Sequence, residues 1–198
     1  MRAKRTRLMM LALVLSISPG LAQAATDEQK SADELRHLKF LEWETGDWDA
    51  TIVLSDPAGG EPQRFWGEQT DREGACGLWL ITDLRMVAGK DGAEPPPYEG
   101  HGVLGYDPDK KKLVGIWIDS STDWLATAEG SLDAAGKTLT LDVASRDPSS
   151  GGPMTRQFVT TRLAADHRRL EIFVPLPDGG RLGVATIDYR RRGTERAD

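Results

Sequence analysis

Cysteine and histidine, which many small proteins use to bind metals or to cross-link the fold, are scarce in this chain. Cys76 is the only cysteine among 198 residues, so no internal disulfide forms and the hydrophobic core must hold the fold. The neighbours Gly77, Leu78 and Trp79 predict a buried, unreactive thiol. With one cysteine and three scattered histidines, we expect no metal site. The sequence also has no nucleophile elbow, Walker loop or dinucleotide fingerprint.

Long apolar runs are absent except at the start of the chain. That run extends from Leu8 to Ile17 behind a basic start, whereas a membrane-spanning helix needs about 20 apolar residues. The small-x-small sequence Ala22-Gln23-Ala24 follows it. These features predict a secretory signal peptide over 1–24, cleaved after Ala24. We therefore expect a periplasmic or secreted protein with no stable membrane insertion after cleavage.

Positive charge is in deficit in the expected mature chain. Removing residues 1–24 removes four basic and no acidic side chains, which leaves 174 residues with 21 basic and 31 acidic groups and a formal net charge of −10. The field of such an acidic protein repels nucleic acid and anionic lipid. We therefore expect no nucleic-acid partner.

Helix signals are confined to one place. A capping box runs from Ser31 to Glu34, and Leu35, Leu38 and Leu41 follow at near-helical spacing. This pattern predicts one short amphipathic helix near the start of the mature chain. No other segment shows a helical pattern of similar quality, which favours an all-β fold.

From residue 46 onward, apolar and polar residues alternate with a period of two. The expected strands cover about 46–54, 63–72, 77–88, 98–107, 112–119, 124–131, 138–145, 154–164, 169–175 and 181–191. Turn signals rich in glycine, proline and aspartate separate them. Many short strands with no helices between them predict an antiparallel sandwich or barrel.

Loop lengths decide between a sandwich and a barrel. If ten strands run up and down, the short connections and the helix fall at one end, and most of the longer connections fall at the other. This asymmetry is typical of a cup with a plugged floor and an open mouth. We predict an all-β fold: a single antiparallel up-and-down β-barrel of about ten strands with a short N-terminal helix closing one end. The predicted domain covers 33–192, between a polar spacer at 25–32 and a polar tail at 193–198.

The start of the first strand resembles the Gly-x-Trp opening of lipocalins and other calycins, because it contains Gly46-Asp47-Trp48. In that superfamily the tryptophan lies at the closed end and an arginine from the last strand packs on it. The resemblance implies that Gly46, Trp48, Arg190 and Arg191 form the barrel floor. A cation–π contact there is expected to stabilise the fold by about 0.5–2 kcal/mol.

A longer resemblance covers roughly 33–192. The matching segments are His37-Leu38, Gly46-Asp47-Trp48, the run from Glu99 to Asp107, Trp117-Ile118-Asp119-Ser120, and Tyr189-Arg190-Arg191. In this order they resemble the bacterial family called domain of unknown function 1579, which is grouped with calycin-like barrels. The resemblance implies a barrel, but it implies no established activity and no catalytic residues.

Six polar and aromatic residues are expected near the predicted mouth and are candidates for ligand contacts: Glu99, His101, Trp117, Asp119, Asp123 and Trp124. One interpretation is structural, since such residues commonly cap strand ends and cover the core. The other is a small-molecule site with aromatic walls and a few fixed polar groups. We assign no catalytic residue, although His101 with Asp119 or Glu99 is a candidate general-base pair.

Haem deserves separate consideration, because some calycin-like barrels hold it through one histidine. Here His101 would have to face the interior, and the glycines around it leave the alternation undecided. We therefore predict no cofactor, with haem bound through His101 as the alternative.

The predicted interior is apolar with some polar groups, which suits side chains or one small ligand. The leading hypothesis is an exported lipocalin-like protein that binds a small apolar or amphipathic molecule in its barrel and has no catalytic activity of its own. Two alternatives stay open. One is a small periplasmic enzyme with a His/carboxylate pair at the mouth, and the other is a packed barrel that acts through protein contacts on its surface.

Overall fold

The computed structural model describes residues 30–56, 59–147 and 150–193. The residues from Ala32 onward belong to one compact unit. The predicted signal peptide over 1–24, its cleavage site, and most of the predicted spacer and tail lie outside the described residues. In the described part of the chain, no helix is both long and apolar enough to span a membrane.

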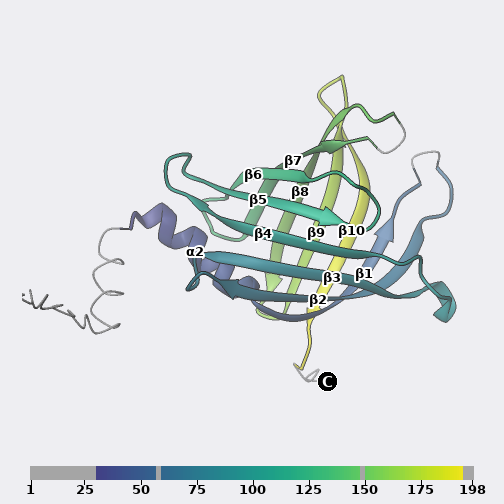
Figure 1. Ribbon diagram of the computed structural model, residues 1–198, viewed down its shortest axis with the longest axis horizontal. Coiled ribbons are helices and arrows are strands. Elements are labelled where there is room, and N and C mark those ends of the chain that lie inside the picture. The colour runs from purple at the N-terminus through teal and green to yellow at the C-terminus, as the bar shows by residue number, and fades with distance from the viewer. Residues whose placement is uncertain (1–29, 57–58, 148–149, 194–198) are drawn as a thin grey trace, which may run out of the picture. The chain divides into compact units, whose positions relative to one another are not determined.

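Ten strands close into a barrel, as Figure 1 shows. Each strand pairs antiparallel with the next one along the chain, and β1 closes the barrel against β10. The predicted fold, an up-and-down barrel with one short N-terminal helix, is confirmed. The strands are β1 (Gly46–Leu54), β2 (Gln63–Gly74), β3 (Trp79–Gly89), β4 (Glu99–Asp107), β5 (Lys112–Asp119), β6 (Ala126–Leu132), β7 (Thr138–Arg146), β8 (Pro153–Ala164), β9 (His167–Pro175) and β10 (Arg181–Arg191), with a 3-10 helix, η1 (Lys90–Gly92), after β3.

The helix α2 (Ala32–Glu44) precedes β1 and contacts β3 and β4. Its first turn carries Asp33 and Glu34, whose negative charges suit the positive end of the helix dipole. Directly after it, Gly46 adopts a φ of 126°, a conformation that glycine reaches more easily than other residues. The chain therefore passes from the helix into β1 with almost no loop.

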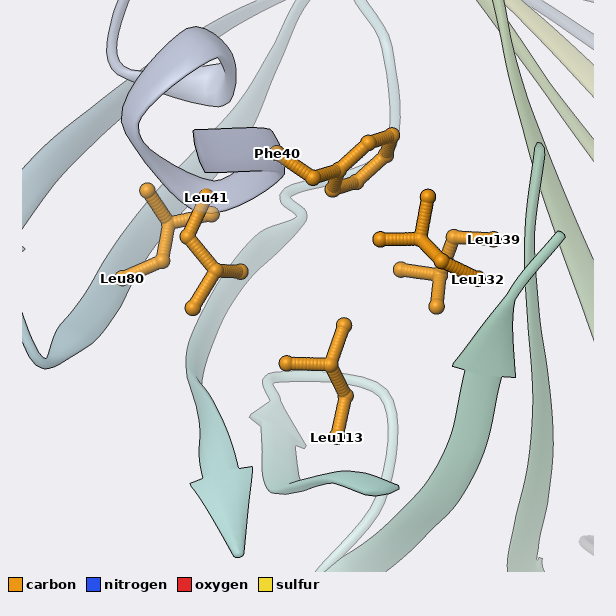
Figure 2. Packing of buried hydrophobic residues seen from close by; sticks show 6 residues of the cluster. All are labelled: Phe40, Leu41, Leu80, Leu113, Leu132 and Leu139. Atoms are coloured by element: carbon orange, nitrogen blue, oxygen red, sulfur yellow. The ribbon is translucent and has the colours of Figure 1, made fainter. Parts of the chain in front are cut away.

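The helix closes one end of the barrel by burying its apolar side chains among strand residues. Figure 2 shows Phe40 and Leu41 of α2 beside four leucines from β3, β5, β6 and β7. The six residues of this cluster are Phe40, Leu41, Leu80, Leu113, Leu132 and Leu139, and all are at most 7% exposed. Burying a leucine or phenylalanine side chain stabilises by about 1.5–3 kcal/mol, so this cluster fixes the helix as a plug.

His37 joins the helix to the sheet through both ring nitrogens. Its Nδ1 lies 2.7 Å from the carbonyl oxygen of Asp33. Its Nε2 accepts a hydrogen bond from the backbone N–H of Leu132, at 3.3 Å. This arrangement requires the neutral ring with its proton on Nδ1. His37 is almost fully buried, which agrees with the packing role expected for a histidine among helix leucines.

The turn between β2 and β3 differs from its prediction. Cys76 is exposed there rather than buried, because three successive residues adopt positive φ angles: 47° at Ala75, 60° at Cys76 and 81° at Gly77. This tight left-handed turn directs the thiol toward solvent. The apolar neighbours Leu78 and Trp79 follow the turn and do not cover it.

Two-residue alternation separates the inner from the outer faces of the strands. Trp48 and Ile52 of β1 are buried, and they lie on the inner face. Residues directly opposite each other on antiparallel strands share a face. Thr160 of β8 is opposite Leu139 of the core, and Leu170 of β9 is opposite Thr160, so both Thr160 and Leu170 lie on the inner face. The inner face of every strand follows in this way.

Candidate functional site

The barrel floor is built around Trp48. Its side chain is 0% exposed, and its Nε1 donates a hydrogen bond to the carbonyl oxygen of Glu44, at 2.9 Å. The guanidinium groups of Arg168 and Arg191 lie 4.2 and 4.1 Å from the centroid of its ring. Desolvated cation–π contacts of this kind are worth up to about 2 kcal/mol or more each, so Trp48 is held from two sides.

The two arginines predicted in the floor point in opposite directions. Arg191 donates hydrogen bonds to the carbonyl oxygens of Trp43 and Thr45 at the end of the helix. A Cβ atom at Gly46 would overlap its guanidinium group, which explains a glycine at this position. Arg190 faces outward and its side chain is 58% exposed. Its assignment to the floor is wrong because adjacent strand residues alternate between faces.

Arg168 supplies a floor contact that the sequence did not reveal. It is 2% exposed and forms ion pairs with Glu44 and Asp71, the latter at 2.7 Å. Asp71 also accepts hydrogen bonds from Gln69 and Thr82. Burial raises the pKa of Asp71 to about 7 and lowers the pKa of Arg168 to about 10. Each buried charge of the floor thus has a partner of opposite sign, as buried charges require.

Above the floor, apolar side chains that face the interior keep partial solvent exposure. On β7, β8 and β9 they follow from the inward register of Leu139 and Thr160, and on β1, β2 and β3 they pack against the Trp48 cluster. The set comprises Leu54, Phe65, Met86, Leu141, Met154, Phe158, Ile172 and Val174. A closed barrel filled by its own side chains would bury these residues as completely as it buries Leu113 or Trp48. The inward apolar side chains above the floor are therefore not fully covered by their neighbours.

Trp117 and Asp119 of β5 lie on the inner face near the mouth. Cβ atoms at Gly100 and Gly102 would overlap the indole ring, so the ring lies directly on the glycine backbone of β4. The indole Nε1 donates to Asp119 Oδ2 at 3.1 Å. Burial and the nearby Asp119 carboxylate raise the pKa of Tyr98 to about 12. These groups form a fixed aromatic and polar rim inside the mouth.

His101 and Glu99 lie on the outer face of β4, away from Trp117 and Asp119. The His101 side chain is 55% exposed, and its Nδ1 lies 2.6 Å from Asp83 Oδ1. Arg72 also binds Asp83, and hydrogen bonds from Arg72 and His101 lower the pKa of that carboxylate. His101 and Glu99 both line an outer groove of about 300 Å³. The expected pairing of His101 with Asp119 or Glu99 does not occur.

The remaining two candidates lie in the loop between β5 and β6. Asp123 and Trp124 are exposed, and the guanidinium group of Arg146 lies 4.3 Å from the centroid of the Trp124 ring. The six candidates therefore do not form one site. Two of them, Trp117 and Asp119, face the lumen, two lie outside the barrel, and two lie on the mouth loop.

Arg156 of β8 also faces the lumen, and the sequence reasoning did not single it out. It lies opposite Val143, a buried residue of the inner face, and its neighbours on that face of β8 are Met154 and Phe158. Its Nε is buried and has no hydrogen-bond partner. Alternation gave no signal here, because both faces of β8 mix polar and apolar residues.

Across residues 30–56, 59–147 and 150–193, no group of three or more His, Cys, Asp or Glu side chains is arranged to hold a metal ion. His101, the residue considered for haem ligation, faces outward and binds Asp83.

A second hollow, of about 440 Å³, lies outside the lumen beside α2. Apolar side chains from the helix and three cationic residues, Arg36, Lys39 and Arg162, line it. Arg162 lies over the rings of Phe40 and Trp43, at 5.5 and 3.9 Å. This hollow is therefore also positively charged. A test of anion binding in the lumen needs a control variant at this hollow.

The chain matches a family model and is similar in fold to solved structures. The family described as "Protein of unknown function (DUF1579)" matches residues 35–191. None of the curated proteins matches the chain. The crystal structure of Rv2717c from M. tuberculosis is similar with a TM-score of 0.56 and 12% identity, over 78% of this chain and 96% of that one. A redesigned beta barrel has a TM-score of 0.39 and 15% identity, over 77% and 94%. The first of these shows a shared fold and nothing about activity.

Proposed function

This chain belongs to the DUF1579 family of proteins of unknown function, and we propose that it binds one small apolar or amphipathic molecule in the upper lumen of its barrel. The main observation behind this proposal is that inward apolar side chains, such as Phe158 and Ile172, are partly exposed. Trp48 and Arg168 of the barrel floor, in contrast, are fully buried. Apolar surface left in contact with water inside a cup is what a ligand would cover.

The mouth has the few fixed polar groups that such a site needs. Trp117 and Asp119 are held by their mutual hydrogen bond, and the N–H of Ser121 donates to Asp119 Oδ1 at 2.9 Å. Side chains held in this way lose little conformational freedom when a ligand binds. The mouth therefore supports recognition of a polar end or edge of the ligand, and the apolar walls support recognition of its body.

We further propose that the protein acts after export, as a periplasmic or secreted protein that starts after Ala24. The basic start, the short apolar run and the small-x-small site of residues 1–24 support this. N-terminal sequencing of protein recovered from the cell envelope or the medium tests it. A first residue of Ala25 is expected, and a mature protein that starts at Met1 would contradict the proposal.

Native mass spectrometry tests the binding function. Protein purified gently after export is measured bare and then with dodecanol and dodecanoic acid, with release of the bound mass on denaturation. We expect saturable binding of at least one compound. Complete absence of a bound mass and of binding to either compound would refute the proposed function.

A matched pair of variants on β6 locates the binding. Ala128 faces inward opposite Val143, and Thr127 beside it is exposed on the outer face. Ala128→Phe should fill the lumen and weaken binding at least about tenfold, the effect of losing about 1.4 kcal/mol. Thr127→Phe should leave the affinity within about twofold. Equal loss in both variants would place the ligand outside the lumen.

A further inference from the structure

We infer that Arg156 binds the carboxylate of an anionic amphipathic ligand, with the apolar part of that ligand lying in the lumen. This inference rests on the proposed function and deepens it, because it names the charge and chemistry of the molecule. The observation behind it is an inward-facing arginine that has apolar neighbours and a buried Nε without a hydrogen bond.

The surroundings of Arg156 are apolar on the inner face. Val143 lies directly opposite on β7, and Met154 and Phe158 flank Arg156 along β8. On the other side, Phe158 pairs with Ile172 of β9. A guanidinium group carries five N–H donors and its charge persists at every physiological pH. Such a group is unfavourable beside apolar walls unless a complementary acceptor reaches it.

No protein group in the described part of the chain provides that acceptor. The Nε of Arg156 is buried without a hydrogen bond, and no ion pair of this residue occurs within residues 30–56, 59–147 and 150–193. The Nε atoms of Arg162 and Arg168 are also buried without a hydrogen bond, but the guanidinium groups of the other inward-facing arginines have other contacts with the protein. Arg168 pairs with two carboxylates, Arg191 binds two carbonyl oxygens, and Arg162 lies on two aromatic rings.

A carboxylate is the anion that fits best. The planar guanidinium fork matches the two oxygens of a carboxylate. One guanidinium balances one negative charge, whereas a doubly charged phosphate monoester calls for a second cation. Arg162 lies six positions after Arg156 on β8, and it is opposite Arg168 of β9. Arg168 already forms an ion pair with Asp71 in the floor. Six strand residues span about 20 Å, so Arg156 lies well above the floor and closer to the mouth.

The test compares three probes of equal chain length: dodecanoic acid, dodecanol and dodecyl phosphate. Isothermal titration at pH 7.5 should show the acid bound about tenfold to a hundredfold more tightly than the alcohol, the range expected for a charge-assisted hydrogen bond. Arg156→Met should abolish this preference and leave the alcohol affinity within about twofold. Arg156→Lys keeps the charge without the fork, so it should retain part of the preference.

Two matched controls remove the same charge elsewhere. Arg181→Met removes an exposed outer arginine that binds Gln157, and it should keep the full preference for the acid. Arg162→Met removes a cation from the hollow beside α2. Loss of the preference in Arg162→Met but not in Arg156→Met would overturn the assignment of the carboxylate to Arg156.

The outcomes separate the two proposals. Equal binding of acid and alcohol by the natural protein would overturn the inference and leave the binding function standing. Tighter binding of dodecyl phosphate than of dodecanoic acid, lost in Arg156→Met, would overturn the choice of a carboxylate. If none of the three probes binds, the proposed function itself fails. If Arg156→Met does not fold, the probe comparison in the natural protein and in Arg156→Lys decides.

Discussion

Arg168 at the floor of the barrel and Arg156 in its upper half face inward from adjacent strands. Arg168 is 2% exposed, contacts Trp48 and Tyr189, and is paired with Glu44 and Asp71. Arg156 has apolar neighbours and partial exposure, and it forms no ion pair with a carboxylate of the described residues. The protein therefore supplies carboxylate partners for the arginine at the floor and none for the arginine in the upper half.

This difference separates stability from function along one barrel axis. Where Arg168 lies, carboxylates and aromatic rings surround the guanidinium group, so its charge is balanced within the floor. Where Arg156 lies, apolar walls and one cation remain uncovered, which costs stability and is typical of a binding site that a ligand completes. Substitutions at the floor should therefore change stability, and substitutions in the upper lumen should change binding.

The largest effect is expected at the floor tryptophan. Trp48→Ala removes a fully buried ring held by two arginines and should lower the free energy of unfolding by about 3–5 kcal/mol. Trp124→Ala, on the exposed mouth loop, should cost no more than about 1 kcal/mol, the worth of one exposed cation–π contact. Urea unfolding measures both. A loss below about 0.5 kcal/mol for Trp48→Ala would remove it from the floor.

The same substitution at the two inward arginines should have opposite effects on stability. Arg168→Met leaves Glu44 and Asp71 buried without their cation and should cost about 3–5 kcal/mol. Arg156→Met removes an unpartnered guanidinium from an apolar wall and should leave stability unchanged or raise it by up to about 1 kcal/mol. Chemical unfolding of both variants compares them. Similar destabilisation of the two would contradict the distinction between a completed floor and an open lumen.

The smallest effect concerns tryptophan emission. A ligand in the upper lumen should change the fluorescence of Trp117, which lines the mouth, and leave that of Trp48 in the sealed floor unchanged. Trp117→Phe should therefore remove the emission change caused by dodecanoic acid, with less than about 1.5 kcal/mol lost in stability. Trp79→Phe alters an exposed tryptophan of β3 and serves as the control. A response that survives Trp117→Phe and disappears in Trp79→Phe would move the ligand to the outer face.

Much of the fold was predictable because the strands and turns carry local signals. Period-two alternation and glycine- and proline-rich turns predicted ten strands, and loop lengths favoured a barrel over a sandwich. The capping box and the leucines from Leu35 to Leu41 gave the helix. Cys76 was mispredicted because the nearby apolar residues suggested burial, whereas three positive φ angles turn its side chain outward.

The candidate site was less predictable because its residues depend on strand faces and on long-range pairing. His101 lies between Gly100 and Gly102, so alternation could not show that it faces outward. Arg168 was not singled out, because its partners Asp71 and Glu44 come from distant parts of the chain. Arg156 is in a strand whose two faces have similar polarity. Only the closed barrel shows that it has no partner.

The most direct test of the account is a crystal structure of the protein soaked with 12-bromododecanoic acid, in which anomalous scattering locates the bromine. We predict a bromine peak inside the lumen between the floor and the mouth, with the carboxylate within hydrogen-bonding distance of Arg156. A bromine peak found solely in the outer groove beside His101 or in the hollow beside α2 would contradict the central claim that the upper lumen is the binding site.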